Sequence, residues 1–236
     1  MAARIVAGLV LWCTGWSVQG AAQEGIAMPG GVTVLGAVRR AGAASMPAPP
    51  TVDALLDAVG GLEPQAYRFA TLLLRPAGGA PPRFVCVSPG ARHAALLIEN
   101  DPVLRSEQAV VSGLLSGTIE RLPALAPPFG RLGSDRSGAT LLQPGDLLAV
   151  PQRTAQVYVV LRDGRVNVLS HRPERSAADY LAEGPADRLA RPRDYVLHTP
   201  EGHVTVLAVE GWNAQPTAVP PGSMLAPVAT CLPVPQ

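Results

Sequence analysis

Lysine is absent from this chain of 236 residues, so all nineteen of its basic residues are arginine. The absence excludes a Walker-A phosphate loop, a lysine Schiff base and a lysine general base, because each depends on that amine. Charge is scarce as well: charged residues make up 16% of the chain, and 18 acidic residues leave a net charge of +1. Without a strong field of either sign, we expect neither nucleic acid nor an anionic lipid surface as a partner.

Motifs that carry catalysis or hold cofactors are also missing. After the first 22 residues the chain has no GxSxG, HExxH, CxxC or GxGxxG pattern. Its four histidines are dispersed, and although His198 and His203 flank a predicted hairpin turn, no third ligand for a metal site is evident. The sequence therefore predicts a protein that is not an enzyme and that has neither a metal nor a cofactor.

Residues that form turns are abundant instead. The chain has 24 glycines and 25 prolines, while 47% of its residues are hydrophobic and only 4% are aromatic. This composition favours short strands joined by many turns over a bundle of helices.

The first 22 residues have the pattern of a secretory signal peptide. Arg4 precedes the apolar run Ile5–Trp12, and small residues lead to a predicted cleavage site after Ala22. The run is shorter than the ~20 apolar residues of a membrane span, and no later stretch reaches that length. We therefore expect a periplasmic protein with no transmembrane segment after cleavage. Cys13 lies in the removed peptide, because the large Trp12 before it does not fit a lipoprotein-processing site.

Cleavage leaves Cys86 and Cys231, for which two interpretations stay open. In an oxidising compartment the two can form a disulfide, which would close a long loop and stabilise the fold by up to ~5 kcal/mol. Alternatively, Cys86 is a buried residue of a strand and Cys231 belongs to a loose tail. Neither cysteine has a CxxC neighbour, so redox catalysis is not expected.

The spacing of hydrophobic residues predicts a strand-rich part, a helical part and a second strand-rich part. The first part has a helix over 52–59, which Thr51 caps, and strands over 32–38, 68–74 and 83–87. A helical hairpin follows. The last part has a helix over 177–183 and strands over 147–150, 156–162, 165–170, 195–198, 203–209 and 223–228. Two similar units in one chain suggest a repeated module in an α+β fold.

Two stretches of the chain carry a family resemblance. Val32–Val38 together with Val52–Leu62 resembles a soluble-ligand-binding β-grasp (SLBB) module, which occurs in bacterial polysaccharide-export proteins. From about residue 120 to 228 the chain is similar to the GfcC-like family of capsule-biosynthesis proteins. The matching segments follow one another in the order LQPGD at 142–146, VP at 150–151, VYV at 157–159, YL at 180–181, TPEG at 199–202, GWN at 211–213 and PPGS at 220–223.

The resemblance implies an α+β fold of two β-grasp (SLBB-like, ubiquitin-like) units joined by a helical hairpin. It divides the chain into a signal peptide at 1–22, an SLBB-like β-grasp domain at 29–90, a helical hairpin at 91–123, a GfcC-like β-grasp domain at 124–230 and a tail at 231–236. Family members commonly end in an amphipathic helix, whereas the last seven residues of this chain include two prolines. A function that depends on such a helix is therefore not expected.

The same resemblance implies a non-catalytic accessory role in capsular or exopolysaccharide biosynthesis and export, with polysaccharide or polysaccharide-export proteins as partners. Because few aromatic residues are present to stack on sugars, weak polysaccharide contact fits better than a high-affinity lectin. Two alternatives stay open. One is a periplasmic polysaccharide-modifying enzyme, and the other is a subunit of the outer-membrane export channel, which would need a lipidated cysteine and a membrane-spanning C-terminal helix.

Arg121 is the candidate ligand-binding residue, because Arg121–Pro123 matches an Arg-Leu-Pro element of the family. A guanidinium near a domain junction suits a uronic acid carboxylate or a phosphate, which it binds through two hydrogen bonds. Alternatively, Arg121 caps the C-terminus of the preceding helix. Trp212 and Asn213 follow a strand and are further ligand-binding candidates, or else they form an anchoring turn.

Overall fold

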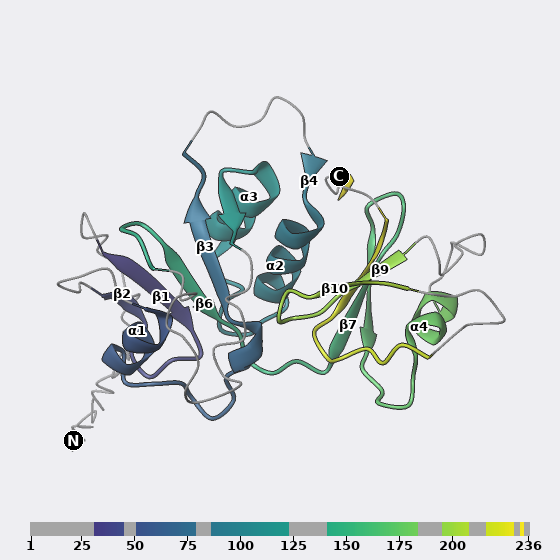
Figure 1. The fold of residues 1–236 in the computed structure, drawn as a ribbon, viewed down its shortest axis with the longest axis horizontal. Coiled ribbons are helices and arrows are strands. Elements are labelled where there is room, and N and C mark those ends of the chain that lie inside the picture. The colour runs from purple at the N-terminus through teal and green to yellow at the C-terminus, as the bar shows by residue number, and fades with distance from the viewer. Residues whose placement is uncertain are drawn as a thin grey trace, which may run out of the picture.

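The computed structural model describes residues 31–44, 51–78, 86–122, 141–183, 195–207, 216–228 and 232–233. In these ranges the chain forms two five-stranded sheets, one two-stranded sheet and four α-helices, which confirms the predicted α+β class (Figure 1). None of the helices in these ranges has the length and apolar character needed to cross a membrane. The predicted signal peptide at 1–22 lies outside the described residues, as do Trp212, Asn213 and Cys231.

The first sheet has the strand order β2-β1-β6-β3-β5. Strands β1 and β6 are parallel, and the other neighbours are antiparallel. Strand β1 ends at Gly36, a position that requires glycine, because a Cβ there would lie 2.1 Å from the carbonyl oxygen of Val150 and the residue has a φ of +92°. The five strands are β1 (Val32–Gly36), β2 (Gly42–Ala44), β3 (Leu72–Pro76), β5 (Ile119–Arg121) and β6 (Leu147–Val150).

The central strand β6 comes from a distant part of the sequence. The predicted division assigns Leu147–Val150 to the unit at 124–230, whereas in the structure this strand lies between β1 and β3. Leu148 and Val150 face one side of the sheet and Ala149 faces the other, and all three are fully buried. A strand buried on both faces needs a continuous apolar run, which these residues supply. The first sheet is therefore complete only after the chain has passed through both middle helices.

Two other elements of the first part differ from the sequence prediction. The predicted strand over 68–74 begins as a short 3₁₀ helix, η1 (Arg68–Ala70), and only then continues as β3. The predicted strand over 83–87 is described only as β4 (Cys86–Val87), which does not join the first sheet. It pairs antiparallel with β12 (Leu232–Pro233), so the last described strand of the chain lies beside the segment that leads into α2.

Helix α1 (Val52–Ala58) covers one face of the first sheet, as predicted. Thr51 caps it, since the Oγ1 atom accepts a hydrogen bond from the backbone N–H of Ala54 at 3.3 Å. Leu55 and Leu56 are buried against the sheet. The short helix is therefore held by a polar cap at one end and by its apolar face.

Helices α2 (Pro89–Glu99) and α3 (Gln108–Ser116) lie between the two large sheets (Figure 1). One hydrophobic core joins them to both sheets, with Leu72 and Leu74 from the first sheet and Tyr158 and Met224 from the second. Eight of the eleven residues of α2 are buried. Apart from Arg92 and His93 these residues are apolar, as suits a helix with apolar neighbours on opposite sides. The two sheets are thus packed through these helices.

The second sheet has the strand order β10-β9-β11-β7-β8, with β7 and β11 parallel. The predicted hairpin around Asp163–Gly164 is present, and Leu161 N–H donates across it to Arg165 O at 2.8 Å. The strands are β7 (Gln156–Val160), β8 (Val166–Ser170), β9 (Tyr195–His198), β10 (Val204–Val206) and β11 (Met224–Pro227).

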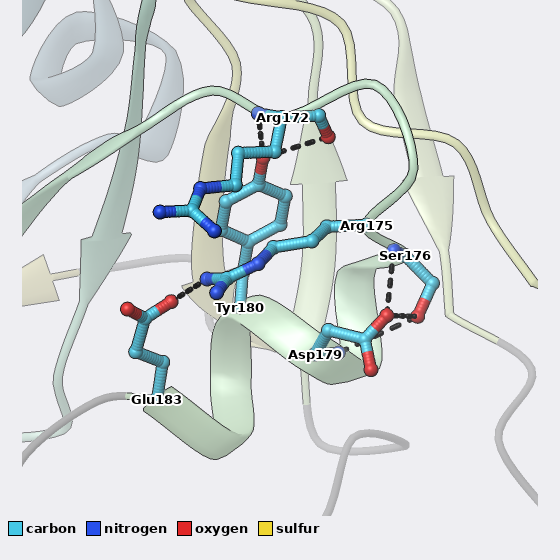
Figure 2. A network of polar contacts seen from close by, with 6 residues as sticks. All are labelled: Arg172, Arg175, Ser176, Asp179, Tyr180 and Glu183. Carbon is cyan, nitrogen blue, oxygen red and sulfur yellow. Dashed lines mark hydrogen bonds and ion pairs between the residues drawn. The ribbon is translucent and has the colours of Figure 1, made fainter.

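Helix α4 (Ala177–Glu183) covers the face of the second sheet that points away from α2 and α3. Tyr180 is fully buried there, and its hydroxyl accepts from Arg172 N–H at 2.6 Å and donates to Arg172 O at 3.2 Å (Figure 2). Ser176 and Asp179 hold the first turn through their side chains, because Asp179 Oδ2 accepts from the Ser176 N–H at 2.8 Å. The tyrosine therefore ties the loop before α4 to the helix.

Candidate functional site

Arg121 lies at the end of β5, on the edge of the first sheet, where its backbone pairs with Leu74. The preceding helix α3 ends at Ser116 and has Gly117 as its C-cap, in the left-handed conformation. The structure therefore does not support the interpretation that Arg121 caps that helix. Its guanidinium points to the second sheet instead.

The half-buried Arg121 side chain links the two large sheets. Nη2 donates a hydrogen bond to the carbonyl oxygen of Pro200, 3.0 Å away, in the turn between β9 and β10. Burial lowers the pKa of Arg121 to about 10, while the nearby carboxylate of Glu201 acts in the opposite direction. The guanidinium thus stays charged at neutral pH, at the place where the first sheet meets the second.

Two buried histidines lie close to this arginine. The ring centroids of His93 in α2 and His198 in β9 are 6.4 Å apart, and the rings meet edge to face. His93 is fully buried, and its Nε2 donates to the carbonyl oxygen of Gly222 at 2.7 Å, which fixes the proton on that nitrogen. Among the described residues, His93 Nδ1 and His198 Nε2 have no hydrogen-bond partner. We call Arg121, His93 and His198 the junction cluster.

Both histidines of the junction cluster are neutral at physiological pH. Burial, and then the charge of Arg121, lowers the pKa of His93 to about 3. The same two causes lower the pKa of His198 to about 4. The site therefore combines one permanent cation with two uncharged imidazoles, each with one buried nitrogen that has no hydrogen-bond partner among the described residues.

Gly222 lets the elements of the junction approach each other. A Cβ on this residue would lie 3.1 Å from both Pro200 Cγ and Thr154 Cγ2, and its φ is +83°. Nearby, the Tyr67 hydroxyl donates to Pro221 O at 3.4 Å. Burial, followed by the charge of Glu201, raises the pKa of Tyr67 to about 12, so it remains a neutral phenol. The junction is thus built from six separate segments of the chain.

The chemistry of the junction cluster suits anion binding better than acid–base catalysis. A guanidinium carries five N–H donors, and the hydrogen bond to Pro200 uses one of them. The described hydrogen bonds of Arg121 and His93 go to backbone carbonyls and not to a nucleophile. In the described part of the chain, no three His, Cys, Asp or Glu side chains are grouped so that they could hold a metal ion.

The sequence did not predict the pairing of His198 with His93. His198 and His203 flank the hairpin turn, as the sequence predicts, but Val204 is the residue paired with His198, and His203 is exposed. The only hint in the sequence is that His93 lies one helical turn before Leu97, on the apolar stripe of α2. A polar residue on such a stripe is buried and needs a partner.

Asp146 has a structural role that the sequence revealed only in part. Its carboxylate accepts from the backbone N–H of Gln143 at 2.8 Å, as expected of an aspartate in a turn. It also accepts from Arg75 in β3 through two hydrogen bonds, Nε to Oδ1 at 2.7 Å and Nη2 to Oδ2 at 2.8 Å. The hydrogen bond to Asp146 is the main cause that raises the pKa of Arg75. This pair fixes the turn before β6 to the first sheet.

Trp212 and Asn213 are outside the described residues, so their part in ligand binding stays a prediction. Comparison of the chain with protein-family models and with curated proteins finds no match.

Proposed function

We propose that the protein is a periplasmic, non-catalytic accessory factor in capsular or exopolysaccharide biosynthesis and export. The ordered series of motifs from 142 to 223, together with the SLBB-like segment from 32 to 62, supports this proposal. In this proposal the first sheet with α1 is one β-grasp unit and the second sheet with α4 is the other. Helices α2 and α3 are the helical hairpin between the two units.

The junction cluster is the observation on which the ligand-binding part of the proposal depends. Arg121 presents a positive charge beside two neutral imidazoles, between a strand edge of one sheet and a turn of the other. A uronic acid carboxylate or a phosphate substituent of a polysaccharide matches the guanidinium in charge and in geometry. Binding there would contact both sheets at once, as expected of a protein that holds a polymer in transit.

Deletion of the gene in its host tests the proposed function. We expect polysaccharide to be lost from the cell surface. The polysaccharide on the surface and the polysaccharide in the periplasm are quantified separately. An unchanged surface layer would overturn the proposed function, because the resemblance would then report the fold alone.

Complementation with variants tests the role of Arg121. Arg121→Gln leaves a shorter, polar side chain and removes the charge, so we expect it to fail to restore surface polysaccharide. Arg105→Gln is the matched control, since Arg105 is exposed in the connection between α2 and α3. Thermal unfolding of both purified variants separates loss of ligand binding from loss of fold.

A further inference from the structure

A polar cleft lies where the chain passes from the first sheet to the second. It has a volume of about 370 Å³ and is bounded by the end of α2, by the linker 151–155 between β6 and β7, and by strands β7 and β8. This volume falls within the range of about 300–1,000 Å³ that is usual for small-molecule sites. We call it the linker cleft.

A buried carboxylate fixes two walls of the linker cleft to each other. Asp101 is 4% exposed, and its Oδ1 accepts from the backbone N–H groups of Val103 and Leu104 at 2.8 and 2.9 Å. Its Oδ2 accepts from the N–H of Gln152 in the linker at 2.5 Å. Three backbone donors therefore stabilise this charge, and the walls are held in place before any ligand binds.

The other polar groups of the cleft are uncharged apart from one arginine at its exposed rim. They are the amide and hydroxyl side chains of Asn100, Gln152, Thr154, Gln156, Tyr158 and Ser170. The buried Tyr158 hydroxyl donates to Gln156 Oε1 at 3.4 Å, and burial raises its pKa to about 12, so it remains protonated. Asn100 Nδ2 donates to Leu96 O at 2.9 Å, which fixes the orientation of that amide.

Apolar side chains complete the lining. Leu97, Pro102 and Pro151 border the same cavity. A ligand that fits this surface must combine many hydroxyl groups, which can each donate and accept, with an apolar C–H face and no net charge. A sugar ring has these properties, whereas an anion would find its countercharge only in the exposed Arg153.

We propose that the linker cleft binds one uncharged pyranose ring of a carbohydrate chain. The proposal rests on the proposed function for the source of that chain in the cell, but the contact itself follows from the cleft. Gly222 packs against Leu97 and Thr154, which line the cleft, and against Pro200, which accepts from Arg121. The cleft is therefore close to the junction cluster.

A direct binding experiment tests this assignment. The purified protein is titrated with glucose, galactose, mannose and N-acetylglucosamine, each to about 50 mM because a single ring in an open cleft binds weakly. We expect at least one sugar to shift the side-chain amide resonances of Gln152 and Gln156 in heteronuclear NMR spectra. The proposal is overturned if none of the four sugars shifts them, or if the shifts map to other residues.

Two variants separate a built site from incidental contact. Ser170→Trp fills the exposed rim of the cleft, and Gln152→Ala removes a side-chain amide but keeps the backbone N–H that bonds Asp101. Each should weaken sugar binding at least tenfold. Ser112→Trp, on the exposed side of α3, is the matched control and should bind as the wild type does. Unchanged binding by both cleft variants would also overturn the proposal.

The outcome is independent of the test of the proposed function. Sugar binding that survives Arg121→Gln, while export in the cell fails, would support both assignments. Absence of sugar binding, together with loss of surface polysaccharide on gene deletion, would remove the cleft assignment and leave the accessory function standing. Sugar binding without any change in surface polysaccharide on gene deletion would leave the cleft assignment standing and overturn the accessory function.

Discussion

His93 in α2 donates a hydrogen bond from Nε2 to the carbonyl oxygen of Gly222, 2.7 Å away in space and 129 residues later in the chain. The bond joins the middle helices to the turn that leads into β11 of the second sheet. It requires a neutral ring in the tautomer that carries the proton on Nε2, with Nδ1 buried and without a partner among the described residues. Protonation of that ring therefore costs folding free energy.

Stability should fall as the pH is lowered below about 6.5. Above the ordinary histidine pKa of 6.5, His93 and His198 are neutral in both the folded and the unfolded chain and add no pH dependence. Below it, only the unfolded chain takes up protons, until the folded pKa values of about 4 and 3 are reached. The loss is on the order of 2 kcal/mol per histidine between pH 7 and pH 5, measurable by urea unfolding.

His93→Gln tests the source of this pH dependence. Glutamine can still donate to the Gly222 carbonyl but does not titrate, so the loss of stability between pH 7 and pH 5 should shrink by about half. His203→Gln is the control, since His203 is exposed. A His93→Gln variant with the same pH dependence as the wild type would show that the buried ring is not responsible.

The ion pair of Arg75 with Asp146 should contribute more to stability than a surface pair does. Asp146→Asn keeps the shape of the side chain but removes the charge that Arg75 contacts twice. Because the Asp146 side chain is 1% exposed and that of Arg75 is 22% exposed, we expect a loss of about 3 kcal/mol, at the low end for buried pairs.

Asp163→Asn is the matched comparison for this pair. Asp163 pairs with Arg165 at 2.6 Å, but both side chains are about half exposed or more. Solvent screens such a pair, so little change is expected in the free energy of unfolding. Equal losses in the two variants would contradict the argument from burial.

Two glycine substitutions should change stability in opposite directions. Gly222→Ala places a Cβ 3.1 Å from Pro200 Cγ and Thr154 Cγ2 at a φ of +83°, and should cost about 1–3 kcal/mol. Gly90→Ala, in the first turn of α2, meets no atom within 4 Å and should stabilise the protein by up to about 1 kcal/mol. Urea unfolding measures both, and destabilisation by the second would contradict the assigned helix.

The sequence predicted elements whose signals are local. Helices α1 and α4 and the β7–β8 hairpin follow from a capping residue, an apolar stripe or a two-residue turn within about ten positions. The predicted sheet for strand β6 is wrong, because its partners β1 and β3 are about 75 to 115 residues earlier and an apolar run does not indicate which strands will pair with it.

Of the residues in the junction cluster, the sequence predicted a binding role only for Arg121. Arg121 was found through a motif, but its hydrogen bond to Pro200 spans 79 residues and depends on how the two sheets pack. Nothing in the spacing of the histidines indicates that α2 brings the ring centroid of His93 to 6.4 Å from that of His198. Such contacts between distant segments have no periodic signature in one sequence.

A disulfide between Cys86 and Cys231 stays a prediction, which thiol chemistry can test. Cys86 in β4 is directly opposite Pro233 of β12. Cys231 precedes β12 in the sequence and lies outside the described residues. Thiol labelling of the exported, denatured protein should find neither cysteine free, and a non-reducing peptide map should show the two joined. Reduction should then lower the free energy of unfolding by about 3–5 kcal/mol, as for other long loops.

Cys231→Ser gives the control for this prediction, because it should leave one reactive thiol at Cys86 after denaturation. If both cysteines of the wild type are labelled instead, the other interpretation of the sequence holds, with Cys86 as a strand residue and no covalent link. The β4–β12 pairing would then depend on backbone hydrogen bonds between strands of two residues each. Such a short ladder is marginal in water, so mutation of Pro233 should in that case change the stability little.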